Sequence, residues 1–173
     1  MCLLIYYSRF LFVMNAFRIG MGYDVHRLVP DRDLFIGGVK IDYQFGLLGH
    51  SDADVLIHAI CDAILGAANL RDIGFHFPDN DPKYKGADSK VLLAECVKLI
   101  ADKGYAIANI DATVCAEKPK LNPFIPQMQS LLAEILMVDV DNVSIKATTT
   151  EGLGFVGNKE GIAAYAVALI YKL

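Results

Sequence analysis

The hydrophobic positions follow two periods along the chain, and together they predict strands mixed with helices. Short segments that are strongly apolar or alternate with polar residues, bounded by glycine or polar residues, are typical of strands. These segments are residues 18–26, 34–41 with a turn at Gly37-Gly38, 105–116, 143–147 and 162–173. The last segment is so apolar that periodicity alone does not distinguish a strand from a buried helix.

Three longer segments carry apolar residues at helical spacing. They run from a cap at Ser51 or Asp52 to about Ala68, from Asp88 or Ser89 to Gly104, and from Ile125 to Leu136. Hairpins as well as crossovers join these elements. We therefore predict an α+β fold with a mixed sheet of the four-stranded type and helices on one of its faces.

The chain has 173 residues without repeats or linkers, which predicts one catalytic domain over residues 18–173. Residues 1–17 are apolar but interrupted by Arg9, shorter than the roughly 18–20 residues of a membrane span, and lack the basic start of a signal peptide. We expect this segment to be an extension outside the fold, with Met14 as an alternative start.

Composition and charge narrow the class of protein. Hydrophobic residues make up 54% of the chain and charged residues 21%, which excludes a disordered tail. A net charge of −4 disfavours a surface built to hold nucleic acid. The four cysteines contain no CxxC pair, and three lie in apolar segments, so we expect buried thiols and a cytoplasmic protein.

Candidate metal ligands occur on the first predicted strand and the first predicted helix. Asp24 and His26 are two residues apart, so on a strand their side chains point to the same side. His58 lies one helical turn from both Asp54 and Asp62, which suits a metal-binding imidazole flanked by carboxylates. An exposed hydrogen-bonded pair and an ordinary core histidine are the alternatives. Three such ligands would leave one position of a tetrahedral Zn²⁺ open.

Candidate phosphate-binding groups occur in polar loops. His50 and Ser51 are expected at a helix N-terminus, where free N–H groups attract anions, although Ser51 could simply cap the helix. The loop 148–155 (TTTEGLGF) offers hydroxyls and Glu151, a suitable Mg²⁺ ligand, although its first four residues also match a capping box. The loop 116–122 (AEKPKLN) could surround a flat base. Spacing alone thus predicts a metal-assisted site for an anionic small molecule, with hydrolysis and phosphoryl transfer both open.

Seven segments in order over residues 18–173 resemble the 2-C-methyl-D-erythritol 2,4-cyclodiphosphate synthase family. They are GYDVHR, GLLGHSDADVLIHAICDAILGAA, DIGFHFPD, KGADS, KPKLNPFIPQM, KATTTEGLGF and EGIAA. The resemblance implies a phosphorus–oxygen lyase of the non-mevalonate route to isoprenoids. It would convert 4-diphosphocytidyl-2-C-methyl-D-erythritol 2-phosphate to the 2,4-cyclodiphosphate and CMP. It also implies a homotrimer, with the sheets packed around a threefold axis and active sites between subunits.

The resemblance also implies residue roles. Asp24, His26 and His58 would bind Zn²⁺ or another divalent cation, Glu151 would bind Mg²⁺ or Mn²⁺ at the diphosphate, and His50 and Thr149 would stabilise the transition state. The implied substrate contacts are Ser51, Asp72, Gly74, Phe77, Asp79, Asp81, Ala116, Lys120, Leu121, Asn122, Thr148, Thr150, Phe155 and Asn158.

One position departs from the family pattern. Asn158 stands where the family often has arginine, near an axial cavity that Phe155 would line and that can hold isoprenoid diphosphates. Two other functions remain as hypotheses. One is a zinc-dependent phosphate-ester hydrolase that activates water, and the other is a non-catalytic trimer that binds isoprenoid diphosphates.

Overall fold

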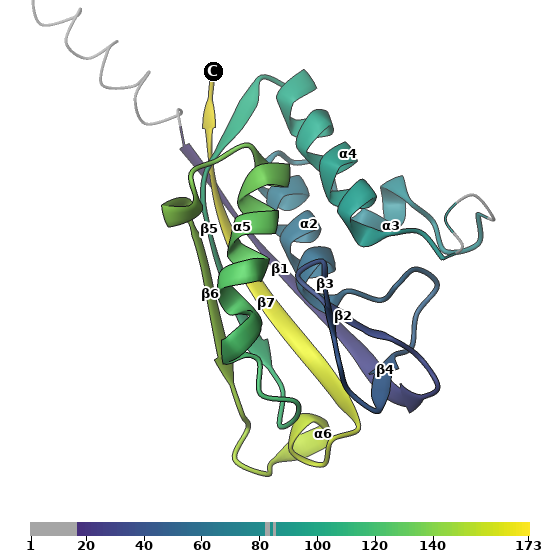
Figure 1. The fold of residues 1–173 in the computed structure, drawn as a ribbon. Helices are drawn as coiled ribbons and strands as arrows, with labels where there is room; N and C mark the ends of the chain where they lie inside the picture. Colours follow the sequence, from purple (N-terminus) through teal and green to yellow (C-terminus); the bar gives the residue numbers. More distant parts are fainter. Residues whose placement is uncertain (1–16, 82–83, 85) are drawn as a thin grey trace, which may run out of the picture.

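The computed structural model describes residues 17–81, 84 and 86–173, and in them a five-stranded mixed sheet forms the centre of the fold (Figure 1). Its strands are β1 (Phe17–Pro30), β4 (Phe45–Leu47), β5 (Tyr105–Cys115), β6 (Val143–Thr148) and β7 (Gly161–Lys172). They are ordered β4-β1-β7-β5-β6, and only the β5–β6 pair is parallel. The α+β class is confirmed, and the apolar C-terminal segment is a strand.

The sheet has one strand more than the sequence predicted. The additional strand, β4, is only three residues long and pairs with the end of β1, from Leu28 to Pro30. A segment this short carries no detectable alternation. Strands β2 (Leu34–Ile36) and β3 (Val39–Ile41) form a separate hairpin around the Gly37-Gly38 turn, as predicted. Both of these glycines have positive φ, at 60° and 75°, a conformation that favours glycine.

Three helices cover one face of the sheet: α2 (Val55–Ala67), α4 (Ser89–Asp102) and α5 (Ile125–Leu136). Helix α2 packs directly on β1 and β7, and α5 packs on β6. The short helices are α3 (Ile73–His76), η2 (Asn122–Phe124), η3 (Val140–Asn142) and α6 (Gly154–Gly157). The predicted placement of helices on one face is therefore confirmed. Over the described residues, no helix combines the length and apolarity that crossing a bilayer requires.

Helix α2 starts later than predicted. Its N-cap is Asp54, whose fully buried carboxylate accepts the N–H groups of the first helical turn. The same carboxylate accepts the N–H groups of Gly37 and Gly38 at 2.9 and 2.6 Å. The prediction that Ser51 or Asp52 caps the helix is wrong. The Gly37-Gly38 turn lies beside Asp54, and the N–H groups of this turn need an acceptor at that position.

Close contact between β1 and α2 depends on two glycines. Gly20 and Gly22 face α2, and a Cβ on Gly22 would overlap the carbonyl oxygen of Ala59 in the helix backbone. Because a helix backbone cannot move aside cheaply, β1 reaches this depth only without a side chain. The same approach brings Asp24 and His26, further along β1, within reach of α2.

We expect Gly22→Ala to lower the free energy of unfolding by about 3 kcal/mol, since the added methyl group collides with backbone atoms. The matched control is Gly66→Ala. Gly66 is an exposed residue of α2, and a Cβ there meets no atom within 4 Å. This control should raise the free energy of unfolding by up to about 1 kcal/mol through helix propensity. Urea unfolding followed by circular dichroism measures both; equal effects of the two changes would contradict this packing.

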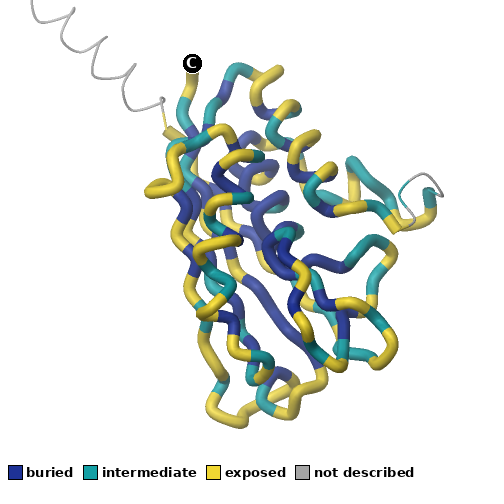
Figure 2. Tube along the Cα trace, viewed as in Figure 1, coloured by how far each residue is buried: buried dark blue, intermediate teal, exposed yellow. Residues whose placement is uncertain are grey.

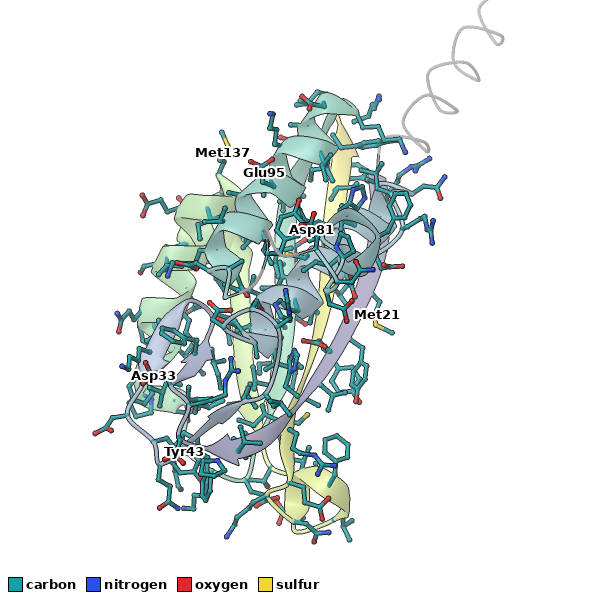
Figure 3. The ribbon with its side chains drawn as sticks, turned by 90° about the vertical axis from the view of Figure 1, so that its right-hand side faces the viewer. Met21, Asp33, Tyr43, Asp81, Glu95 and Met137 are labelled. Atoms are coloured by element: carbon teal, nitrogen blue, oxygen red, sulfur yellow. The ribbon has the colours of Figure 1, made fainter. Side chains whose placement is uncertain are left out.

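Along β1 and β7, the opposite face of the sheet carries exposed apolar side chains that no other described element of the chain covers. The burial colours show buried residues concentrated in the sheet and in α2, with exposed residues around them (Figure 2). Met21 lies on this open side, away from Met137 at the helix layer (Figure 3). The exposed large apolar residues of β1 and β7 are Phe17, Ile19, Met21, Tyr23, Val25, Tyr165 and Val167. A contiguous apolar surface of this kind marks an interaction site rather than a solvated face.

The described cysteines are free thiols. Cys61 and Cys96 are fully buried, and Cys115 is half-buried. Burial raises the pKa of both the Cys61 and the Cys115 thiol. The prediction of buried, unpaired thiols is confirmed for Cys61 and Cys96, and Cys115 is unpaired but only half-buried. Cys2 and the segment 1–16 lie outside the described residues.

Candidate metal-binding active site

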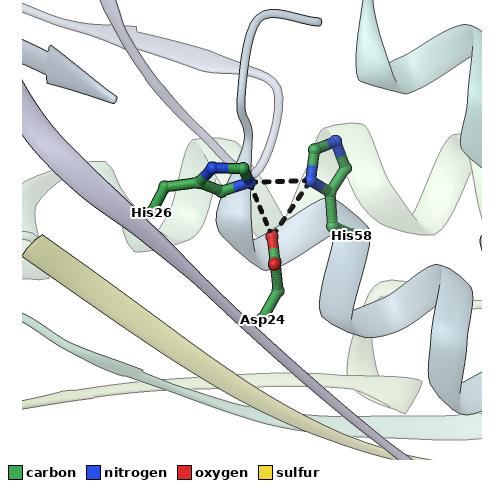
Figure 4. Close-up of side chains that lie close together, drawn as sticks. All are labelled: Asp24, His26 and His58. Atoms are coloured by element: carbon green, nitrogen blue, oxygen red, sulfur yellow. Dashed lines mark hydrogen bonds and ion pairs between the residues drawn. The ribbon is translucent and has the colours of Figure 1, made fainter. Parts of the chain in front are cut away.

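The three predicted metal ligands converge at one point between β1 and α2 (Figure 4). Asp24 and His26 come from the helix-facing side of β1, and His58 comes from the first turns of α2. Asp24 Oδ2 lies 2.9 Å from His26 Nε2 and 3.0 Å from His58 Nδ1, and the two ring nitrogens are 3.2 Å apart. Two residues at i and i+2 on a strand and one residue on a helix therefore form the predicted three-residue group.

The hydrogen bonds around His26 leave electron-rich atoms facing each other. Its Nδ1 lies 2.8 Å from the carbonyl oxygen of Leu48, which only accepts, so Nδ1 carries the proton. The Nε2 lone pair is then directed at the Asp24 carboxylate. A lone pair and a carboxylate oxygen at 2.9 Å need a cation between them, either a metal ion or a second proton on His26.

The spacing of the three atoms fits a metal ion. Zinc–ligand bonds of about 2.0–2.1 Å in a tetrahedron place neighbouring ligand atoms about 3.3 Å apart. The observed separations are 2.9, 3.0 and 3.2 Å, so the group needs to open by only a few tenths of an ångström. One carboxylate and two imidazoles form a suitable donor set for zinc and leave a fourth position free.

The ionisation of the group follows from its mutual contacts. Burial opposes the charge on Asp24, but hydrogen bonds with His26 and His58 together outweigh burial and hold the pKa of Asp24 well below its usual range. Burial also opposes charge on His26, yet the hydrogen bond with Asp24 prevails and raises the pKa of His26. The Asp24 carboxylate is thus ionised and stabilises a cation beside it.

The predicted carboxylates beside His58 are elsewhere. Asp54 caps α2, and Asp62 accepts the N–H of Ile73 at 2.7 Å. Burial raises the pKa of both carboxyls. The prediction was wrong because residues four apart share only a broad helix face, and the His58 ring extends toward β1. The groups that contact its outer nitrogen, Nε2, are the hydroxyls of Ser89 and Ser51, at 2.9 and 3.2 Å.

A cavity of about 510 Å³ opens beside the metal-binding group. It brings together seven predicted site residues from β1, α2 and the segments 49–51 and 73–80. They are His26, His50, Ser51, His58, Gly74, Phe77 and Asp79, joined by Gly49, Ile73, Pro78, Asn80, Tyr84 and Leu92. Among them, His50 and Ser51 lie in the loop before α2. Their predicted place at a helix N-terminus is wrong, since Asp54 already satisfies that terminus.

Arg32 supports the loop that carries His50, and the sequence did not reveal it. Its guanidinium donates to the carbonyl oxygens of Gly49 and Ser51 at 3.2 and 3.0 Å. These carbonyls flank His50 on both sides, so Arg32 fixes the backbone from which His50 projects. An arginine in a polar turn is indistinguishable in sequence from a solvated surface cation.

A second hollow, of about 170 Å³, lies at the carboxyl ends of β5 and β6. Six predicted residues line it, namely Ala116, Lys120, Leu121, Asn122, Thr148 and Thr149, with Glu117, Pro119 and Ala147. It shares no lining residue with the cavity at the metal-binding group. Within one chain, the predicted site is therefore divided between two separate hollows.

The other predicted residues line neither hollow. They are Asp72, Asp81, Thr150, Glu151, Phe155 and Asn158. Asp72 caps α3 by accepting from Phe75, and the Asn158 amide donates to Glu160 at 3.3 Å. Glu151 has a positive φ of 54° and accepts the Thr149 hydroxyl at 2.9 Å.

The loop after β6 is held by a residue that sequence analysis missed. Glu117 Oε1 accepts the N–H groups of Thr150 and Gly152 at 3.0 and 3.2 Å. The predicted capping box is wrong, because α6 starts only after Leu153 and has no side-chain cap. The sequence signal for this contact is a carboxylate two residues after the end of β5, since the ends of parallel neighbouring strands meet at one sheet edge.

Fold and site together define an α+β protein with a three-ligand metal-binding group that opens into a cavity. The YgbB family model matches residues 17–171, and the chain belongs to this family. A relative from Parabacteroides distasonis is 64% identical over 156 residues, which are 90% of this chain and 97% of the relative. A relative from Phocaeicola vulgatus is 64% identical over 155 residues, which are 90% of this chain and 97% of that relative. Both are named 2-C-methyl-D-erythritol 2,4-cyclodiphosphate synthase, the family that the sequence motifs resemble.

Solved structures share this fold. The bifunctional IspDF of Campylobacter jejuni aligns with a TM-score of 0.88 at 44% identity, covering 91% of this chain and 42% of that chain. The chain thus spans less than half of the bifunctional protein. The IspF of Plasmodium falciparum, solved as a CDP complex, aligns with a TM-score of 0.80 at 36% identity, covering 91% and 97%.

Proposed function

We propose that this chain converts 4-diphosphocytidyl-2-C-methyl-D-erythritol 2-phosphate to 2-C-methyl-D-erythritol 2,4-cyclodiphosphate and CMP. The observation that carries the proposal is the Asp24/His26/His58 group beside a cavity of about 510 Å³. It occurs in a chain 64% identical to synthases of that name. These comparisons favour the synthase over both the hydrolase and the non-catalytic trimer.

The reaction is a phosphoryl transfer within one molecule. An oxygen of the 2-phosphate forms a bond to the β-phosphorus, while the bond from that phosphorus to the bridging oxygen breaks. The bridging oxygen leaves with its electron pair as part of CMP, which makes the enzyme a phosphorus–oxygen lyase. No general base is needed, because a phosphate near neutral pH is already an anion. The protein therefore contributes by aligning the two phosphates and by offsetting charge.

The cation-binding residues would offset that charge. A Zn²⁺ held by Asp24, His26 and His58 would act as a Lewis acid toward a phosphate oxygen. Glu151, whose carboxylate is exposed at the loop after β6, would hold Mg²⁺ or Mn²⁺ at the diphosphate. His50 from the loop before α2 and Thr149 beside Glu151 would donate hydrogen bonds as charge moves to the leaving oxygen.

The two hollows would take different parts of the substrate. The cavity at the metal-binding group, with Ser51, Phe77 and Asp79, would hold the methylerythritol phosphate, and Gly74 at the same cavity would contact the ribose. The hollow at β5 and β6, where Lys120 to Asn122 supply backbone and side-chain polar groups, would hold the cytosine. Asp72 would contact the ribose. Thr148 and Thr150 would contact the diphosphate, and Asp81 would contact the methylerythritol part.

Division of the site supports a homotrimer, in which each active site combines the metal-binding cavity of one subunit with the cytosine hollow of the next. The open apolar face of the sheet would then pack around the threefold axis, which gives it a partner.

Phe155 and Asn158, beside the start of β7, would lie near that axis, where an isoprenoid diphosphate could bind. The Asn158 side chain is a neutral amide that donates to Glu160, so it would contribute no positive charge there. A cytoplasmic location stays a prediction.

The direct test is to incubate the purified protein with the CDP-linked substrate and Mg²⁺ and to follow phosphorus NMR. We expect CMP and a cyclic diphosphate to form together. Both should disappear when a zinc chelator is added and return when zinc is restored, because the metal-binding group is part of the site. A chelated sample without substrate serves as the control for folding, by circular dichroism.

Two other outcomes would contradict the proposal. CMP with an open-chain product would mean that water, not the 2-phosphate, attacks, and would favour a hydrolase. Absence of turnover by folded, zinc-loaded protein would favour a binding protein.

A further inference from the structure

The outer nitrogen of His58 leads into a buried chain of polar groups. His58 Nε2 lies 2.9 Å from the hydroxyl of Ser89, the first residue of α4, which is fully buried. The Ser89 hydroxyl donates a short hydrogen bond to Oδ1 of Asp52, and the Ser89 N–H donates to Oδ2 at 3.1 Å. None of these contacts is part of the three-ligand group itself.

The protons along this chain can be assigned. The Asp52 carboxylate accepts hydrogen bonds from two atoms of Ser89 and from the N–H of Asp54 at 3.3 Å. With its only hydroxyl hydrogen given to Asp52, Ser89 Oγ can offer His58 just a lone pair. His58 Nε2 must then carry a proton. In the neutral ring Nδ1 is a lone pair available to a metal ion beside Asp24, and a second proton on Nδ1 takes that place in the metal-free site.

We propose that Ser89 and Asp52 are positioning residues for the metal site. They fix His58 in the Nε2–H tautomer and in the ring orientation that presents Nδ1 to a metal ion. This inference rests on the metal site of the proposed function. Partners of this kind orient metal-binding histidines and increase their basicity, and their loss costs about 10–100-fold in metal affinity or activity.

Ser51 contacts the same nitrogen but is less suited to this role. Its hydroxyl oxygen is 3.2 Å from His58 Nε2, accepts the N–H of Ala53 at 3.1 Å, and lines the open cavity. Solvent or substrate can compete for it there. Ser89 is closer, fully buried, and has its hydrogen directed away from His58. This difference indicates that Ser89, rather than Ser51, fixes the tautomer of His58.

Backbone hydrogen bonds also join the two segments that carry Asp52 and Ser89 at the cavity. The N–H of Asp52 donates to Ala87 at 3.1 Å, and the N–H of Gly86 donates to the carbonyl of His50 at 2.8 Å. The segment 50–52 is therefore attached to the start of α4. The Ser89–Asp52 link thus holds His58 relative to the loop that carries His50.

The test measures the dissociation constant for zinc by competition with a chromophoric chelator, using metal-free protein. Ser89→Ala should raise it about 10–100-fold, because the His58 tautomer is then no longer selected. The matched control is Ser130→Ala, since the Ser130 hydroxyl donates to Pro126 on the exposed side of α5. The control should bind zinc like the wild type. Ser89→Ala within twofold of wild type would overturn the inference.

A second measurement does not depend on any variant. The ¹⁵N chemical shifts of the imidazoles in the zinc-bound wild type should show His58 protonated at Nε2 and His26 at Nδ1. His58 protonated at Nδ1 would overturn the inference even if Ser89→Ala fails to fold. If the wild type binds no zinc at all, the metal site of the proposed function fails instead, so the two failures are distinguishable.

Asp52→Asn tests the far end of the chain. The hydroxyl and the N–H of Ser89 donate to different oxygens of Asp52, and asparagine replaces one of these oxygens with an NH₂ group that cannot accept. We expect weaker zinc binding than in the wild type, and an effect that is less than additive with Ser89→Ala, because both changes act on His58 through one hydroxyl. Full additivity would mean that Asp52 acts independently of Ser89.

Discussion

His58→Ala is expected to abolish tight zinc binding and to reduce turnover by about 10³-fold or more. Lewis-acid stabilisation of phosphate charge is worth several kcal/mol, and each 1.36 kcal/mol is a factor of ten in rate. Removing His58 leaves Asp24 and His26, too few ligands for a stable zinc site. Zinc content by mass spectrometry and the rate of CMP release measure the two effects.

The variant should remain folded. His58 lies at the edge of the cavity, where water can fill the space left by the ring, and alanine is the strongest helix former at this position near the start of α2. Its far-ultraviolet circular dichroism should match the wild type. Activity like the wild type in this variant would remove His58 from the site.

His50→Ala provides the contrast, because His50 lines the same cavity but does not belong to the three-ligand group. It should keep zinc at the wild-type stoichiometry and still lose turnover. Loss of zinc in both variants would indicate that the cavity as a whole had collapsed. The pair therefore separates metal binding from transition-state stabilisation.

Local spacing explains only part of the metal-binding group. Asp24 and His26 face one side because a strand repeats every two residues, and His58 faces them because α2 packs on β1 at Gly20 and Gly22. The first fact depends only on neighbouring residues. The second depends on a tertiary contact, which the spacing suggested as one of two alternatives and which the resemblance implied.

Groups that hold the site in place were missed because their partners are distant in sequence. Ser89 contacts His58 across 31 positions, and Glu117 contacts Thr150 across 33. Neither contact has a local periodicity. Competition between equivalent local signals explains the wrong helix start, since Ser51, Asp52 and Asp54 are all good caps and only the position of the Gly37-Gly38 turn selects Asp54.

The open sheet face was hidden in the sequence for a related reason. On β1, the outward residues Ile19, Met21 and Tyr23 alternate with Gly20 and Gly22, so the larger apolar side chains point away from the helices. A hydrophobic pattern does not tell which face of a strand the rest of its own chain covers. The structure shows that on β1 the larger apolar side chains are on the uncovered side, so a charge added there would oppose packing against a partner.

Met21→Asp is accordingly expected to convert the proposed trimer to monomers and to remove nearly all activity. Met21 lies opposite Val167 in the β1–β7 pair, in the middle of the open apolar face. A threefold assembly would bury three copies of the new carboxylate with no cation beside them, which costs several kcal/mol per charge. Sedimentation velocity gives the oligomeric state, and CMP release gives the activity.

Met137→Asp is the matched control, since it makes the same substitution at a side chain that is 82% exposed on the helix layer, against 65% for Met21. It should leave both the trimer and the activity intact. The Met21 variant should still bind zinc, because Asp24, His26 and His58 all belong to one chain. Zinc-loaded monomers without activity would show that the second half of the site comes from a neighbouring subunit. Fully active monomers would show that one chain suffices and that the open face serves another partner.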